Sequence, residues 1–258
     1  MRRVTPQFNA EHARRWQDAD AAECYVHRIP YPEETFDVLR SLITDEATAA
    51  LDVGCGTGNI ARALAPFVDR VDAIDIAAPM IEVGRRLPRG ASPNILWQVA
   101  PAESAGLRPP YALVVGGASL HWMDYEVVLP RFRKALTERG VLAVVRLSEA
   151  VESAWDKEIK EITERYSTAK EYVPFDMITI WEEAQLYRRV GTWITKPAPF
   201  EQSIENFIAA FHAQSNLTRA HVDSERLDAE VHEVMKRHCP HGFVRRQVVA
   251  HLEWGKPL

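Results

Sequence analysis

The feature that most constrains this chain is a glycine-rich turn between an apolar segment and a helical segment. Residues 49–53 are apolar apart from Asp52, the turn reads Gly54-Cys55-Gly56-Thr57-Gly58, and helical spacing continues over 59–65. Glycine permits the backbone dihedrals of a sharp strand-to-helix turn and lets a ligand approach the main chain closely. The first helical turn then offers free N–H groups and a partial positive charge. The pattern predicts a site for an anionic or nucleotide-like ligand.

An acidic residue follows this turn where a ribose-binding carboxylate is expected. Asp75 lies near the end of a second strand pattern, residues 71–76, roughly 20 residues beyond the glycines. A carboxylate in that place accepts hydrogen bonds from both ribose hydroxyls. A dinucleotide fingerprint would have glycine or alanine where this chain has Asn59. We therefore expect a nucleoside ligand, and a nicotinamide-dependent oxidoreductase and a purely structural turn are the disfavoured alternatives.

Apolar strand patterns alternate with helical patterns through the first 150 residues. This alternation is typical of an α/β fold with a parallel, doubly wound sheet. The strand patterns cover residues 49–53, 71–76, 95–99, 111–115 and 141–145, and helical spacing covers 59–65, 80–87 and 126–136. Helical spacing dominates beyond residue 150, and strand patterns return at 192–200 and 244–254.

We divide the chain into four parts on this basis. They are an N-terminal lid segment (1–37), a cofactor-binding Rossmann-like core (38–150), a helical insert or cap (151–190) and a completion of the sheet (191–258). Aromatic residues in and near the insert form either a lid over a substrate or ordinary core. They are Trp155, Tyr166, Tyr172, Phe175, Trp181 and Trp193.

Composition narrows the range of ligands. Hydrophobic residues make up 47% and charged residues 26% of the 258 residues, which is typical of a globular protein. The net charge of −5 and the lack of a basic run argue against a nucleic-acid partner. No apolar stretch is long enough to span a membrane, and residues 1–7 lack the apolar run of a signal peptide. We expect a cytoplasmic protein with a small-molecule substrate.

The spacing of cysteine and histidine predicts neither a disulfide framework nor a metal site. Cys24, Cys55 and Cys239 are odd in number and far apart, and the histidines lack metal-binding spacing. No residue indicates the oligomeric state.

Residues 51–59 resemble motif I of the class I S-adenosylmethionine-dependent methyltransferases, and residues 71–80 resemble their second motif. Segments 111–122, 140–145 and 249–255 are similar to the small-molecule members of the family, in the type 11 or trans-aconitate methyltransferase-like branch. The resemblance implies a Rossmann-like sheet of seven strands with an antiparallel last strand and a helical insert. It also implies an S-adenosyl-L-methionine cofactor and in-line methyl transfer to a small organic molecule.

The same resemblance implies roles for single residues. The glycine loop would contact the methionine and ribose parts of the cofactor, Asp75 would hold the ribose hydroxyls, and Ile76 and Met80 would pack against adenine. Tyr25, Arg28 and Tyr31 resemble an entrance segment that reaches the methionine end, although an ordinary amphipathic terminus is the alternative. The implied cofactor-binding set is Arg28, Gly54, Cys55, Gly56, Asn59, Asp75, Ile76, Met80, Ala102, Glu103, Gly116 and Gly117.

One position departs from the family pattern. An acidic residue usually precedes Ala102 and binds the adenine amino group, but this chain has Pro101, which carries neither a carboxylate nor an N–H. The contact then falls to Glu103, to the backbone of Ala102 or to water. This departure keeps a non-catalytic S-adenosylmethionine-binding protein as an alternative function.

The candidate for acid–base chemistry is His121, which follows the fourth strand pattern. Methyl transfer from a sulfonium needs few catalytic groups, but a base or a residue that orients the acceptor helps when the acceptor is a hydroxyl or an amine. His121-Trp122 recurs in the small-molecule relatives. The alternative is that His121 only packs or caps a turn.

Overall fold

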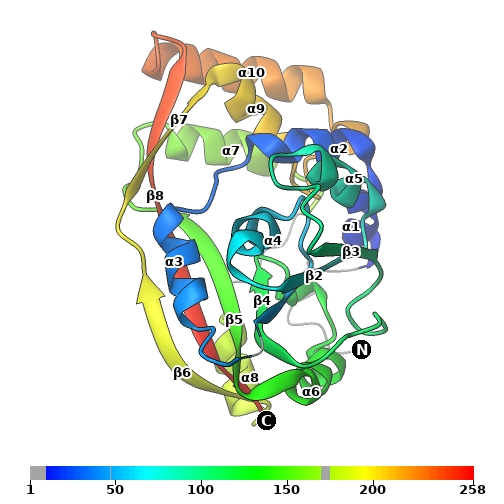
Figure 1. Ribbon diagram of the computed structural model, residues 1–258. Helices are drawn as coiled ribbons and strands as arrows, with labels where there is room; N and C mark the ends of the chain where they lie inside the picture. The colour runs from blue at the N-terminus through cyan, green and yellow to red at the C-terminus, as the bar shows by residue number, and fades with distance from the viewer. Residues whose placement is uncertain (1–9, 47, 170–174) are drawn as a thin grey trace.

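One mixed sheet organises the residues that the computed structural model describes, which are 10–46, 48–169 and 175–258. Within them the sheet has eight strands in the order β3-β2-β1-β4-β5-β8-β6, and β7 pairs with β8 (Figure 1). The predicted lid segment and insert lie partly outside the described residues. Residues 1–7 and Tyr172 lie wholly outside them.

The first five strands form the predicted parallel sheet. Apolar side chains cover both of its faces in two large clusters, which is why these strands read as continuous apolar runs. The strands are β1 (Ala49–Val53), β2 (Arg70–Asp75), β3 (Ile95–Val99), β4 (Tyr111–Gly117) and β5 (Leu136–Glu149). Three helices connect them: α4 (Asn59–Leu64), α5 (Ala78–Arg86) and α6 (Tyr125–Ala135).

The antiparallel part of the sheet corrects the predicted strand count. The last strand, β8 (Phe243–Pro257), is antiparallel to β5 as expected, but two strands pair with its other edge. They are β6 (Tyr187–Ile194) and β7 (Ala198–Ser203). The described residues therefore form eight strands rather than the predicted seven. The prediction of a single strand over residues 192–200 is wrong. Thr195 interrupts the pairing because its Oγ1 accepts a hydrogen bond from Ala250 N at 2.9 Å, and Pro197 follows without an N–H.

Three helices gather beyond the carboxyl end of β5. They are α7 (Asp156–Tyr166), α9 (Ile204–His212) and α10 (Ser224–His238), which share one apolar cluster and lie together at the top of Figure 1. By contrast, α8 (Met177–Glu183) packs Trp181 into the cluster under the sheet that also holds Phe132 of α6. The residues of the predicted insert therefore contribute to two separate packing units.

The N-terminal helices cover the carboxyl edge of the parallel strands and one sheet face. They are α1 (Ala10–Arg14), α2 (Ala19–Cys24) and α3 (Glu33–Ser41). Ala22 of α2 packs against Met80 of α5, and Leu39 of α3 is buried against the sheet. None of the described helices is long and apolar enough to cross a membrane.

Candidate functional site

The glycine loop after β1 has the conformation that its sequence predicts. Gly54, Gly56 and Gly58 have φ values of 63°, 54° and 74°, in the left-handed region that favours glycine. A Cβ on Gly58 would lie 2.3 Å from the Trp97 ring, so this glycine is packed from behind. A Cβ on Gly56 would meet nothing closer than the Tyr25 ring at 3.8 Å. The loop therefore leaves its backbone open to a ligand at Gly56.

Asp75, at the end of β2, is bound to this loop. Its Oδ2 accepts a hydrogen bond from Gly56 N at 2.7 Å, and its Oδ1 accepts one from Ala77 N at 2.7 Å. Burial raises the pKa of the carboxyl, although these backbone hydrogen bonds oppose the shift. A carboxylate has about four acceptor positions, so Asp75 retains acceptor capacity for a ligand. Asp75 is thus a partly buried anchor of the loop that can still accept ribose hydroxyls.

A cavity of about 250 Å³ adjoins the loop, and we call it the cofactor cavity. Its wall combines the glycine loop, the ends of β2 and β4, and apolar side chains. Ile76 is half exposed at its edge while Met80 is buried. The lining consists of Ala13, Trp16, Tyr25, Gly54, Gly56, Ile74, Asp75, Ile76, Met80, Ala100, Pro101, Ala102, Glu103, Gly117, Ala118, Ser119, Trp122 and Met123.

Aromatic residues cover this cavity, and sequence reasoning missed two of them as site residues. The Trp16 ring lies edge-on to Tyr25 at 6.1 Å and to Trp122 at 6.2 Å, measured between ring centroids. Trp16 lies in a short 3-10 helix, Arg15–Gln17, and Trp122 in another, Leu120–Trp122. Such short turns carry no helical periodicity that would reveal an inward face.

Several predicted cofactor residues lie outside the described lining of this cavity. Cys55 is buried behind the loop, and Gly116 packs against Leu120. Asn59 accepts a hydrogen bond from Arg62 at 2.6 Å. Arg28 lies 5.2 Å from the Tyr25 ring centroid and directs Nη1 to the Ala213 carbonyl at 3.4 Å.

The segment that replaces the expected acidic contact does reach the cofactor cavity. Pro101, Ala102 and Glu103 all line it. Glu103 is partly committed, because its Oε1 accepts a hydrogen bond from Asp124 N at 2.9 Å, just before α6. The carboxylate therefore fixes the α6 end of the site and keeps acceptor capacity for a ligand.

A second cavity of about 140 Å³ adjoins the first, and we call it the acceptor chamber. The two share Ala118 and Ser119, which follow β4. Ala118 has a φ of 52°, a conformation that side-chain-bearing residues rarely adopt and that recurs at functional sites. The chamber is lined by Ala118, Ser119, Leu120, His121, Val144, Arg146, Phe175, Asp176, Met177 and Ile178.

His121 lies in the acceptor chamber rather than in the cofactor cavity. Its ring is 6.2 Å from that of Phe175. Burial, and secondarily the charge of Arg28, lowers the pKa of His121 to about 4. The imidazole is therefore neutral at neutral pH and a weak base, which favours orientation of a ligand over proton abstraction.

Arg146 of β5 is one of the chamber residues that sequence reasoning missed. The sequence signal was a charge directly after the apolar run Val141–Val145, at the carboxyl end of a buried strand.

No cluster of metal-ligating side chains occurs among the described residues.

Comparison with known proteins identifies relatives of the core. Residues 50–140 match a family model described as a methyltransferase domain. A trans-aconitate 2-methyltransferase from Azoarcus is 31% identical over 111 residues, which cover 42% of this chain and 42% of that protein. A malonyl-[acyl-carrier protein] O-methyltransferase from Acetivibrio thermocellus is 38% identical over 96 residues, covering 36% of this chain and 33% of that protein. The chain thus spans less than half the length of these relatives.

Solved structures are similar over most of the chain. A candidate type II methyltransferase from Anaeromyxobacter dehalogenans has a TM-score of 0.59 over 89% of this chain and 97% of that one, at 22% identity. A candidate methyltransferase from Bacillus halodurans has a TM-score of 0.54 over 87% and 100% of the two chains, at 18% identity. These similarities establish a shared fold.

Proposed function

We propose that the chain, whose residues 50–140 match a methyltransferase domain, is a class I S-adenosylmethionine-dependent methyltransferase that methylates a small organic molecule. The observation that carries this proposal is the meeting of the cofactor cavity and the acceptor chamber at Ala118 and Ser119. Methyl transfer requires a donor and an acceptor aligned in a site with little water. Two adjoining cavities suit that requirement.

The residues of the cofactor cavity fit S-adenosyl-L-methionine. The bound cofactor supplies an electrophilic methyl group on a sulfonium, which is already a good leaving group. Asp75 has free acceptor positions for the ribose hydroxyls, and the open backbone at Gly56 allows close approach. The half-exposed Ile76 offers an apolar surface to adenine.

The acceptor would occupy the chamber next to His121. A neutral imidazole donates one hydrogen bond and accepts another, so it can hold an acceptor without removing its proton. A nucleophile that is already anionic or unprotonated suits this arrangement, because a weak base contributes little to proton transfer. Phe175 and Leu120 supply apolar walls that limit access of water.

The experiment that tests this function is a methyl-transfer screen with the purified chain. Metabolite pools are incubated with methyl-labelled S-adenosylmethionine, and mass spectrometry reports products that gain the label. We expect labelled products with the wild-type chain and a large reduction with Asp75→Ala at the same cofactor concentration. Tight cofactor binding without any labelled product would instead support a non-catalytic S-adenosylmethionine-binding protein.

A further inference from the structure

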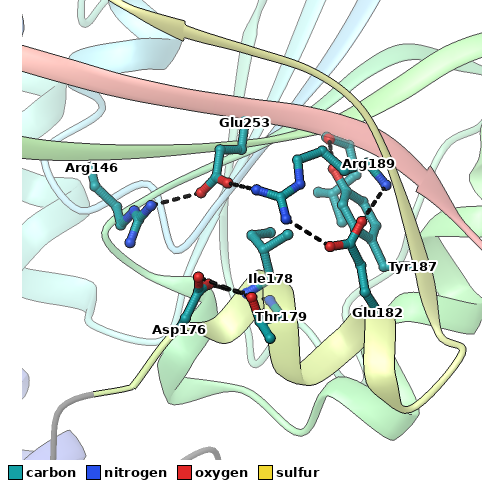
Figure 2. A network of polar contacts seen from close by, with 9 residues as sticks. Arg146, Asp176, Ile178, Thr179, Glu182, Tyr187, Arg189 and Glu253 are labelled. Carbon is teal, nitrogen blue, oxygen red and sulfur yellow. Dashed lines mark hydrogen bonds and ion pairs between the residues drawn. The ribbon is translucent and has the colours of Figure 1, made fainter.

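A buried carboxylate fixes the position of one arginine in the acceptor chamber. Glu253 of β8 is only 9% exposed and accepts hydrogen bonds from Arg146 Nη2 at 2.7 Å and from Arg189 Nη1 at 2.8 Å (Figure 2). Arg189 also donates to Glu182 at 2.8 Å. Arginine and glutamate therefore alternate along the network from Arg146 to Glu182. Glu253 keeps its hydrogen bond to Arg189 when Arg146 binds a ligand. Such charge-assisted hydrogen bonds hold a side chain in a defined orientation.

The guanidinium of Arg146 has hydrogen-bond donors to spare. A guanidinium carries five N–H donors. The Arg146 guanidinium makes one hydrogen bond within the described part of the chain, to Glu253. Half of the Arg146 side chain is exposed. It lines the acceptor chamber together with His121. Arg146 therefore presents a fixed positive charge and open donors to whatever enters this chamber.

The other charged side chain of the chamber has little capacity left for a ligand. Asp176 caps α8: its Oδ1 accepts from Ile178 N and Thr179 N at 3.1 and 3.2 Å, and its Oδ2 accepts from the Thr179 hydroxyl at 3.0 Å (Figure 2). These bonds serve the helix end. A ligand thus finds available donors on Arg146 and a largely committed acceptor on Asp176, which favours a ligand that accepts hydrogen bonds.

We propose that Arg146 binds an anionic group of the methyl acceptor, so that the acceptor is a small molecule bearing a carboxylate. The planar guanidinium matches a carboxylate in shape, and two parallel hydrogen bonds fix its orientation. His121 lies in the same chamber, and Ala118 and Ser119 join it to the cofactor cavity, so the anchored acceptor is directed toward the bound cofactor. This inference rests on the proposed function and adds the substrate class.

Binding to the complex with S-adenosylhomocysteine tests the proposal without requiring turnover. The probes are short aliphatic and aromatic carboxylic acids, each paired with its primary amide, titrated by calorimetry into the wild-type chain and Arg146→Gln. We expect at least one acid to bind wild type more tightly than its amide. Arg146→Gln should weaken the binding of that acid roughly 10- to 100-fold, as expected for lost charge-assisted hydrogen bonds, and leave the binding of the amide nearly unaffected.

The matched control is Arg189→Gln. It removes the other arginine from Glu253, but Arg189 does not line the acceptor chamber. We expect this variant to keep the preference for acids over amides. Equal losses in Arg146→Gln and Arg189→Gln, or no preference for any acid, would overturn the inference. Failure of S-adenosylhomocysteine to bind, or acid binding without methyl transfer, would instead contradict the proposed function.

Discussion

The carboxylate of Asp75 accepts a hydrogen bond from the backbone N–H of Gly56 at 2.7 Å. This bond joins the end of β2 to the loop after β1, and the second oxygen binds Ala77 N at the start of α5. One side chain therefore both shapes the loop and faces the cofactor cavity. Asp75 is partly buried and internally bonded, so it supports the fold of the loop as well as a ligand.

Replacement of Asp75 by alanine should consequently affect binding and stability together. We expect Asp75→Ala to weaken the binding of S-adenosylmethionine by roughly 10-fold or more. It should also lower the free energy of unfolding by about 1–3 kcal/mol, because two backbone N–H groups lose a charged partner. Calorimetric titration and denaturant unfolding measure the two effects. An unchanged dissociation constant in a folded variant would contradict the ribose-binding role.

The buried carboxyl of Asp52 should make stability depend on pH. Burial raises the pKa of Asp52 to about 7, although a hydrogen bond from Ala61 N at 2.9 Å opposes the shift. The folded chain then retains a proton that the unfolded chain loses above about pH 4, so stability falls as pH rises from about 4 to about 7. The effect is at most about 4 kcal/mol.

Asp52→Asn should remove this contribution, because the amide stays neutral. Unfolding curves from pH 5 to pH 8 should decline less steeply for the variant than for the wild-type chain. Parallel curves for the two proteins would show that Asp52 does not carry the proton.

Alanine substitutions at two glycines with similar backbone conformations distinguish the cost of a positive φ from the cost of a steric clash. Gly58 and Gly242 have φ values of 74° and 81°, but a Cβ on Gly58 would strike the Trp97 ring while Gly242 has nothing within 4 Å. We expect Gly242→Ala to cost about 1–2 kcal/mol and Gly58→Ala to cost about 1–3 kcal/mol more. Chemical unfolding of both variants measures the difference, and equal costs would mean that Trp97 moves aside freely.

The low pKa of His121 predicts the pH dependence of methyl transfer. Because the pKa is about 4, the imidazole stays neutral from pH 5.5 to pH 8, and activity should show no inflection near 6.5 from this residue. His121→Gln should raise the KM of the acceptor and leave cofactor affinity unchanged. A wild-type profile that falls below pH 6.5, and loses that fall in His121→Gln, would identify His121 as a general base.

Local residue patterns predicted much of the fold and of the cofactor cavity. The glycine loop, Asp75 and the five parallel strands follow from residues adjacent in the chain, because glycine conformation and strand burial leave local signatures. The break between β6 and β7 escaped prediction because it depends on a bond between Thr195 and the distant Ala250. The cover by Trp16 also depends on tertiary packing, which sequence periodicity does not record.

Calorimetric titration of the wild-type chain with S-adenosylhomocysteine and with NAD⁺ tests the central claim most directly. The cofactor cavity combines Asp75 with the G-x-G-x-G loop, and the helix after this loop begins at Asn59, where a dinucleotide fingerprint has glycine or alanine. We predict binding of S-adenosylhomocysteine, weakened in Asp75→Ala, and no measurable binding of NAD⁺. Tight binding of NAD⁺ without binding of S-adenosylhomocysteine would contradict the account.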